Sequence, residues 1–253
     1  MFGPDDLTDD GFLGGRLRVW QPRRGYRAAT DPVLLAAAVP ARPGQTVLEL
    51  GCGAGVASLC LASRVPGLHL SGLELQPAYA ALARGNAARN GLSLTVVEGD
   101  LTEMPKDLRH SFDHVIANPP YYPAGGGTGA ADPGRERALR EETPLSLWVE
   151  AAVRRLAPRG ILSLILGADR LPDALSALDA RMGSTVVLPL QARPGRGAKR
   201  VILQSRKGGR APFRLLAPFV LHEGAQHEGD RDSFTPAAAH ILRDGGALSQ
   251  GLC

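Results

Sequence analysis

Short apolar runs alternate with helix-length segments through the middle of this 253-residue chain. The pattern predicts strands over 46–50, 68–75, 94–98, 112–117 and 161–166, with helices over 56–63, 77–90 and 145–156 between them. The first of these strands is short and mostly apolar, as is typical of a strand buried on both faces. Strands that alternate with helices indicate a mostly parallel sheet with helices on both faces, so we expect an α/β fold.

The two ends of the chain extend this pattern. Weak alternation over 17–20 predicts a short strand, and Asp31 followed by Pro32 predicts the N-cap of a helix that runs to Val39. After the last strand above, a helix over 171–182 precedes apolar runs at 185–190 and 200–204, which we interpret as an antiparallel hairpin. We therefore expect a lead-in of short hairpin and helix at 1–45, packed on a main domain at 46–253.

Composition excludes several classes of protein. Hydrophobic residues make up 44% and charged residues 21%, close to the averages for globular proteins. No apolar run reaches the roughly 20 residues of a membrane span, and the N-terminus is acidic where a secretory signal needs positive charge. The three cysteines, Cys52, Cys60 and Cys253, form no CxxC pair. They suit a reducing compartment, so we expect a cytoplasmic protein. The histidines lack ligand spacing, so no metal site is expected.

A glycine-rich turn lies between the first buried strand and the next helix. Residues 49–55 have the sequence Glu-Leu-Gly-Cys-Gly-Ala-Gly. Dinucleotide sites favour GxGxxG because their pyrophosphate binds at the helix N-terminus, whereas this turn is GxGxG with an acid before it. The spacing favours a ligand without phosphate there and disfavours a nicotinamide cofactor. A turn that only joins strand to helix is the alternative, and Cys52 is expected to be a small packed residue.

Two more acids follow the next two strands. Glu74 ends one strand and could accept both hydroxyls of a ribose, while Asp100 follows the other and could accept from an adenine amino group. The carboxyl ends of parallel strands meet at one edge of a sheet, where such folds bind ligands. Taken singly, either acid could be a solvated turn carboxylate.

With these motifs in place, residues 46–166 resemble the class I S-adenosylmethionine-dependent methyltransferases. The resemblance implies a Rossmann-like, mostly parallel seven-stranded sheet with a C-terminal antiparallel hairpin, and S-adenosylmethionine as the cofactor. It implies that residues at four places bind this cofactor: Glu49, Gly51, Gly53 and Gly55 around its methionine part, Glu74 at the ribose, Asp100 and Leu101 at the adenine, and Asn118 near the methyl group.

The segment Asn118-Pro119-Pro120-Tyr121 follows the fourth strand at the same edge. A planar NH2 group is a poor nucleophile because its lone pair is delocalised. We expect the Asn118 side-chain oxygen and the Pro119 carbonyl to accept its two hydrogens and hold the nitrogen at attack distance. Pro119 and Pro120 restrain this turn, and Tyr121 would stack on a flat acceptor. The segment resembles that of enzymes that methylate amino groups of adenine, guanine or glutamine; an ordinary Asn-Pro turn is the alternative.

Two outer segments indicate the acceptor. Residues 21–27, Gln-Pro-Arg-Arg-Gly-Tyr-Arg, with Thr-Asp-Pro-Val-Leu-Leu at 30–35, resemble the start of bacterial tRNA adenine-N6 methyltransferases, which modify the adenosine beside the anticodon of a valine tRNA. Ala-Lys-Arg-Val at 198–201 extends the resemblance over most of the chain. Thr30 and Asp31 either cap a helix or line the site. At 138–142 this chain has Ala-Leu-Arg-Glu-Glu where that family carries a run like Ala-Arg-His-Glu, which leaves the exact RNA target open.

The distribution of charge supports a nucleic-acid partner. Lys and Arg exceed Asp and Glu only by 29 to 25, but no acid occurs from Ala180 to His222, which holds nine basic residues. Such clusters supply the sequence-independent part of RNA binding. The residues that we expect to contact tRNA are Arg24, Arg27, Arg193, Arg196, Lys199, Arg200 and Lys207. Ordinary solvated charges are the alternative. Residues 125–129 are glycine-rich and predict a flexible lid.

The main hypothesis is therefore methyl transfer from S-adenosylmethionine to adenine N6 in tRNA. One alternative keeps the chemistry and changes the acceptor to a protein glutamine amide or another RNA amino group such as guanine N2. The other is a non-catalytic RNA-binding protein on a methyltransferase fold. Oligomeric state is left open.

Overall fold

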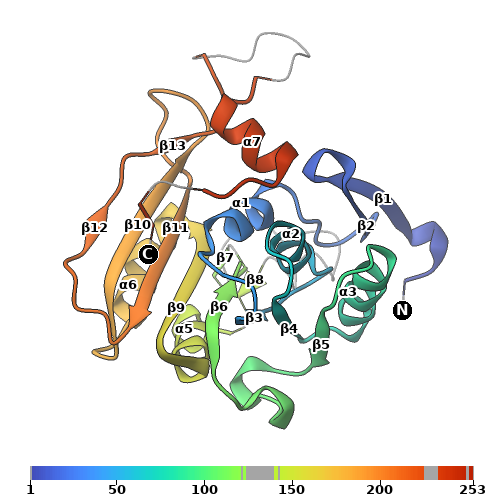
Figure 1. Cartoon of the computed structure of the whole chain (residues 1–253), viewed down its shortest axis with the longest axis horizontal. Coiled ribbons are helices and arrows are strands. Elements are labelled where there is room, and N and C mark those ends of the chain that lie inside the picture. Colours follow the sequence, from blue (N-terminus) through green and yellow to red (C-terminus); the bar gives the residue numbers. More distant parts are fainter. Residues whose placement is uncertain are drawn as a thin grey trace.

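A nine-stranded sheet forms the centre of the molecule (Figure 1). The computed structural model describes residues 2–120, 122–123, 140–141, 143–224, 233–248 and 251–252. The sheet strands are β3 (Thr46–Leu50), β4 (His69–Glu74), β5 (Thr95–Glu98), β6 (Phe112–Ala117), β9 (Leu156–Gly167), β10 (Met182–Gln191), β11 (Arg200–Lys207), β12 (Arg214–Leu215) and β13 (Phe219–Val220). Their order is β5-β4-β3-β6-β9-β11-β10-β12, and β13 also pairs with β10.

Of these strands, β11 alone runs antiparallel to its neighbours. Seven strands are four residues or longer, and the two others are two-residue additions beside β10. The predicted Rossmann-like sheet, mostly parallel and with a C-terminal antiparallel hairpin, is confirmed.

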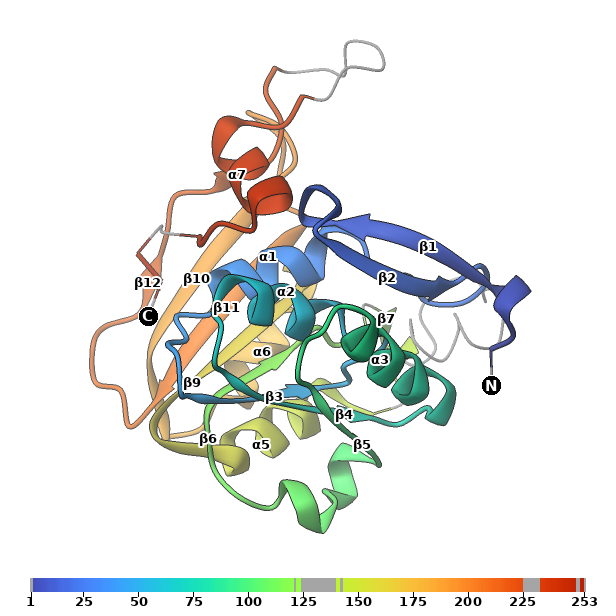
Figure 2. The same cartoon turned by 45° about the vertical axis from the view of Figure 1, so that its right-hand side comes forward.

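Helices cover both faces of the sheet (Figure 2). They are α1 (Thr30–Ala38), α2 (Val56–Arg64), α3 (Pro77–Arg89), α5 (Leu145–Arg155), α6 (Leu171–Ala177) and α7 (Pro236–Asp244), with short 3-10 turns at Pro4–Asp6, Leu13–Gly15, Leu101–Glu103, Lys106–Leu108 and Ala168–Arg170. Successive strand residues point to opposite faces. Val47 packs in the core under α1 and α2, whereas Leu48 packs in the core under α5 and α6. This accounts for strands that are apolar on both sides.

An antiparallel hairpin, β1 (Leu7–Phe12) with β2 (Leu17–Pro22), precedes α1 and lies on α3. Two asparagines one turn apart, Asn86 on α3 and Asn90 at its C-cap, hold the hairpin. Asn86 accepts from the backbone N–H of Trp20 (2.8 Å) and donates to its carbonyl (3.0 Å). Asn90 binds the backbone of Arg18 in the same way, at 2.9 and 2.8 Å. The lead-in is thereby fixed to the helix that follows β4.

Some boundaries differ from those predicted. Helix α1 begins at Thr30 with Ala29 at its N-cap, so Asp31 is not the cap; its carboxylate accepts from Nε of Arg200 at 3.1 Å. The helix predicted over 171–182 ends at Ala177, and β10 begins already at Met182. Helix α7 was not predicted, although the Thr235 side chain caps it and Pro236 opens it. In the described part of the chain, no helix is both long and apolar enough to cross a membrane.

Candidate active site

A cavity opens where the carboxyl ends of β3, β4, β5 and β6 meet; we call it the edge cavity. Nine of the predicted site residues line it: Glu49, Gly51, Gly53, Glu74, Asp100, Leu101, Asn118, Pro119 and Pro120. The sequence placed all of these at strand ends, and the parallel sheet brings them together. Tyr121 and the glycine-rich segment 125–129 lie outside the described residues.

The glycine turn forms one wall of the edge cavity. Gly51 has φ 64°, in the left-handed region, and a β-carbon there would lie 2.6 Å from Cη2 of Trp148. Glycine at this position is therefore required by both conformation and space. Gly55 is placed differently from the prediction. It is the N-cap of α2 and packs against Ala83 and Leu94, away from the cavity lining.

Two buried carboxylates stand behind this turn. Glu74 accepts from the backbone N–H groups of Gly53 and Gln76, each at 2.8 Å, which fixes its carboxylate at the cavity wall. Glu49 accepts from the Ser58 backbone N–H at 3.0 Å and from its hydroxyl. Burial raises the pKa of Glu49 from 4.5 to about 7, and burial also raises the pKa of Glu74. A positively charged or hydroxyl-bearing ligand would therefore stabilise the ionised form of both carboxylates.

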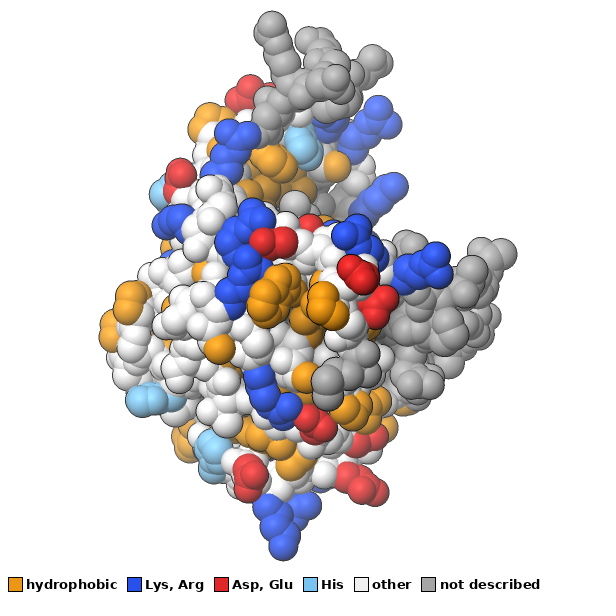
Figure 3. Space-filling model, turned by 90° about the vertical axis from the view of Figure 1, so that its right-hand side faces the viewer, with side chains coloured by type: hydrophobic (Ala, Val, Ile, Leu, Met, Phe, Trp, Pro, Cys, Tyr) orange, Lys and Arg blue, Asp and Glu red, His pale blue; other side chains and the backbone are white. Residues whose placement is uncertain are grey.

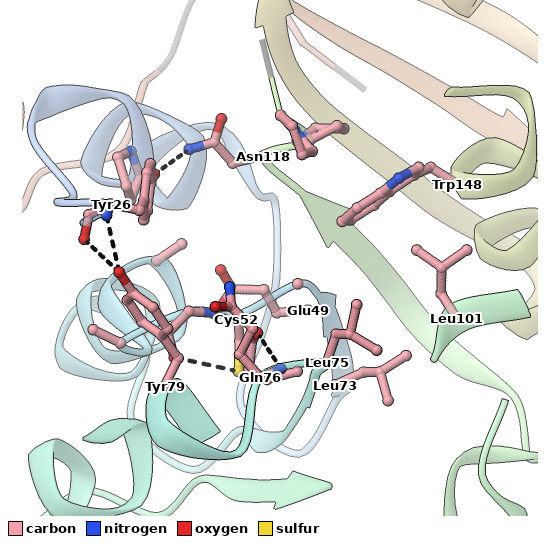
Figure 4. Close-up of a pocket in the computed structure, with 18 of the residues that line it drawn as sticks. Tyr26, Glu49, Cys52, Leu73, Leu75, Gln76, Tyr79, Leu101, Asn118 and Trp148 are labelled. Carbon is pink, nitrogen blue, oxygen red and sulfur yellow. Dashed lines mark hydrogen bonds between the residues drawn. The ribbon is translucent and has the colours of Figure 1, made fainter. Parts of the chain in front are cut away.

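The end of the cavity near β5 is a largely apolar slot. Asp100 accepts from the backbone N–H and hydroxyl of Thr102, both at 2.7 Å. Leu75, Leu101 and Trp148 line the slot, and Leu75 is 51% exposed (Figure 4). The Trp148 Nε1 is buried and has no hydrogen-bond partner among the described residues. A flat ring with polar edges fits these surroundings.

Asn118 follows β6 directly, at the opposite side of the cavity from Trp148 (Figure 4). Its Nδ2 donates to the hydroxyl of Tyr26 at 3.1 Å. Tyr26 in turn is held by Tyr79 of α3, whose hydroxyl accepts from the Tyr26 backbone N–H (2.9 Å) and donates to its carbonyl (3.1 Å). Tyr26 therefore links the other two residues, since its hydroxyl binds the Asn118 side chain and its backbone binds the Tyr79 side chain.

Among the lining residues that the sequence did not indicate, three have large side chains in the site: Tyr26, Tyr79 and Trp148. Tyr26 lies in the lead-in segment whose resemblance was noted, but nothing in the sequence paired it with Asn118, 92 positions later. Trp148 follows a long loop, and no spacing links it to the glycine turn. Cys52, expected to be a packed residue, is buried, and burial raises the pKa of its thiol well above the usual value.

The basic segment, residues 180–222, has side chains at both ends of strand β11. The β10–β11 connection, with Arg196 and Lys199 exposed, lies at the same edge as the cavity, because Arg200 pairs with Gly167 at the carboxyl end of β9. Arg193 in this connection binds the Glu223 carbonyl and Ser233. Lys207 lies at the other end of β11, where its ammonium donates to the carbonyls of Val153 and Leu156. Its position therefore does not support the predicted role in RNA binding.

The lead-in presents mixed charge. Arg27 pairs with Asp10 at 2.7 Å, and Asp9 pairs with both Arg18 and Arg89. Figure 3 shows acidic side chains among the basic ones on the face that carries the hairpin. Arg24 is exposed. Fewer arginines are therefore available to a polyanion here than the sequence suggests. Among the described residues, no group of three or more His, Cys, Asp and Glu side chains could hold a metal ion.

Comparison with known proteins agrees with this geometry. The family model "Methyltransferase small domain" matches residues 29–131. A tRNA1(Val) (adenine(37)-N6)-methyltransferase of Porphyromonas gingivalis is 32% identical over 222 residues, covering 82% of this chain and 86% of the relative. A relative of the same name from Yersinia enterocolitica is 29% identical over 217 residues, covering 83% and 85%.

Solved structures share the fold. A predicted O-methyltransferase of Agrobacterium tumefaciens is 27% identical, with a TM-score of 0.70, covering 86% of this chain and 98% of that one. The 16S rRNA N2 G1207 methyltransferase of T. thermophilus, in complex with AdoMet and guanosine, is 20% identical with a TM-score of 0.55; 79% of this chain and 50% of that one are covered. The second likeness shows the fold alone.

Proposed function

This chain belongs to the family of the tRNA1(Val) (adenine(37)-N6)-methyltransferases, and on that premise we propose that it methylates the exocyclic N6 of an adenine in tRNA. It is an S-adenosylmethionine-dependent N-methyltransferase. The observation that carries the proposal is the position of Asn118, Pro119 and Pro120, which line the same cavity as the glycine turn and the two buried carboxylates.

The edge cavity fits the cofactor in its charge and shape. The Glu49 carboxylate suits the cationic amino group of the methionine part, and Glu74 suits the ribose hydroxyls. The apolar slot beside Asp100, with Leu75 and Leu101 in its wall, suits the adenine ring. The bare backbone of Gly51 leaves room that a side chain would fill. When bound, S-adenosylmethionine supplies an electrophilic methyl group on a sulfonium.

The chain's own part in the reaction is to hold and polarise the acceptor. The Asn118 side-chain oxygen and the Pro119 carbonyl accept the two hydrogens of the amino group, so that its lone pair is aimed rather than delocalised into the ring. Both oxygens carry partial negative charge, which stabilises the positive charge that develops on the nitrogen as its bond to the methyl carbon forms and the methyl–sulfur bond breaks. One of the two amino hydrogens then leaves to solvent as a proton, which restores a neutral amine. Pro119 has a fixed φ, so its carbonyl is held in place.

The β10–β11 connection supports an RNA acceptor. Arg196 and Lys199 are exposed at the edge that carries the cavity, where the phosphates beside a flipped base would pass. We propose that Arg193, Arg200 and Arg24 also contact the RNA. Arg193 and Arg200 bind within the protein as well, to the Glu223 carbonyl and the Asp31 carboxylate. The valine tRNA and its anticodon-loop adenosine are proposed from the relatives' names.

The direct test separates RNA from protein as the acceptor. The protein is incubated with S-adenosylmethionine labelled in the methyl group and with RNA and protein fractions from a strain that lacks the gene. Label in tRNA is expected. Label only in protein would favour a glutamine amide as the acceptor, and lack of any S-adenosylmethionine affinity by calorimetry would favour a non-catalytic RNA-binding protein.

A further inference from the structure

The hydroxyl of Tyr26 accepts a hydrogen bond from the Asn118 amide nitrogen at 3.1 Å, inside the edge cavity. A carboxamide can be rotated by half a turn about its last bond, which exchanges its oxygen and nitrogen. The two orientations differ completely in what they offer to an amino group, because the oxygen accepts and the nitrogen only donates. A phenol hydroxyl can accept from the nitrogen or donate to the oxygen, so the bond to Tyr26 fixes the place and plane of the amide. In the orientation that Figure 4 shows, the nitrogen meets Tyr26 and the Asn118 oxygen is directed away from it.

The loop that carries Tyr26 is itself fixed at several points. The Tyr79 hydroxyl binds both backbone polar groups of Tyr26. Gln21, which is 2% exposed, closes the loop by accepting from the Ala28 N–H at 2.7 Å and donating to its carbonyl at 3.2 Å. Gly25 has φ 111°, and a β-carbon there would lie 2.8 Å from the Tyr79 hydroxyl. The Tyr26 hydroxyl is thus held with little freedom to follow a moving partner.

We propose that Tyr26 is a positioning residue, which holds the Asn118 amide in place, through its nitrogen, for contact with the amino group to be methylated. The inference rests on the proposed function, since it assigns the residue that fixes the amide which that function requires. It also gives the lead-in a role in the reaction, because Tyr26 of the lead-in positions Asn118, the residue that follows β6.

The state of the phenol is compatible with this role. Burial, with the nearby carboxylates of Asp31 and Glu49, raises the pKa of Tyr26 far above its usual range. The hydroxyl is therefore neutral at any working pH and serves as a hydrogen-bond acceptor for Asn118. Tyr26 is neither a base nor a nucleophile here.

The variant Tyr26→Phe tests the proposal, since it keeps the buried ring and removes only the hydroxyl. With labelled cofactor and tRNA from a strain that lacks the gene, we expect kcat to fall by about 10- to 100-fold, the range for a misplaced reacting group. KM for both substrates and the cofactor dissociation constant should change less than about twofold. A merely structural tyrosine would instead show a lower unfolding temperature and weaker cofactor binding with kcat retained, which would overturn the proposal.

A double-mutant cycle shows whether the hydroxyl acts through Asn118. In single-turnover experiments, adding Tyr26→Phe to Asn118→Ala should cost less than about twofold more, because the amide to be positioned is already absent. Full additivity of the two losses would contradict the proposal.

A second readout does not depend on activity. The NH2 protons of the Asn118 side chain, assigned by their loss in Asn118→Ala, should exchange slowly with solvent in the cofactor-free protein and fast in Tyr26→Phe. If the Asn118 NH2 protons exchanged equally fast in the unmodified protein and in Tyr26→Phe, the proposed role of Tyr26 would be refuted. If the unmodified protein transfers no methyl group to tRNA, the proposed function fails while this measurement still judges the role of Tyr26.

Discussion

Asn118 is the residue on which the proposed chemistry depends most. Its amide lies at the edge cavity and is predicted to lie near the cofactor's methyl group, but most of the cofactor's predicted contacts are with the glycine turn and with acids on the other strands. We expect Asn118→Ala to lower kcat by about 100-fold or more, as for loss of one positioned polar group. Calorimetry should show cofactor affinity within about threefold of the unmodified protein. An equal loss of cofactor affinity would contradict the assigned role.

Glu49 makes cofactor binding depend on pH. Its pKa in the folded protein is about 7, raised from 4.5 by burial. The stability that its protonated form contributes is complete below pH 4.5 and is lost as the pH rises through 7. A cationic amino group bound beside Glu49 favours its ionised form. Cofactor binding therefore offsets the stability that the folded protein loses when Glu49 ionises.

We therefore expect the rise in unfolding temperature caused by saturating S-adenosylmethionine to be larger at pH 8 than at pH 6. The variant Glu49→Gln cannot ionise and should show a flatter dependence. Burial raises the pKa of Glu74 in the same direction, so some dependence should remain. An equal thermal shift at both pH values in the unmodified protein would count against a charge contact at Glu49.

At the scale of elements, the turn between β3 and α2 can be tested with two matched glycines. Gly51 and Gly44 both have positive φ, but a β-carbon at Gly51 meets Trp148 at 2.6 Å and one at Gly44 meets nothing within 4 Å. Gly44→Ala should cost about 1 kcal/mol of unfolding free energy from backbone strain alone. Gly51→Ala should cost more and weaken cofactor binding. Equal costs in chemical denaturation, with cofactor affinity unchanged, would show that the contact with Trp148 is unimportant.

The proposed role of the β10–β11 connection in RNA binding can be tested by comparison with the opposite end of the same hairpin. Arg196→Glu and Lys199→Glu change exposed charges near the cavity, whereas Arg210→Glu changes an exposed charge beyond the other end of β11. Each of the first two should weaken tRNA binding and reduce the slope of log K against log salt concentration by about 1. The third should leave both nearly unchanged. If Arg210→Glu had the same effect, the RNA-binding surface would not be at this edge.

Local pattern was sufficient to predict most elements but not their partners in space. The strand predicted over 112–117 coincides with β6, and the acids Glu49 and Glu74 could be assigned to one edge because parallel strands end there. Helix 171–182 was predicted too long, because its apolar residues continue into β10. The resemblance implied a contact of Gly55 with the cofactor, but only the three-dimensional turn shows that Gly55 faces Ala83 of α3.

At the scale of the whole molecule, the site joins distant parts of the chain. Tyr26 comes from the lead-in, Asn118 from the end of β6 and Trp148 from α5. Contacts at such separations depend on how the helices pack, which periodicity does not report. The asparagines of α3 that bind the β2 backbone explain how the lead-in is brought to the cavity: their side chains replace the strand partner that β2 lacks on that side.

The atom that receives the methyl group can be identified directly. After reaction with labelled S-adenosylmethionine and tRNA from a strain that lacks the gene, the tRNA is digested and its nucleosides are separated and identified by mass spectrometry. We expect label in N6-methyladenosine and no such label with Asn118→Ala. Label in N2-methylguanosine, or in a nucleoside methylated on an oxygen, would contradict this expectation.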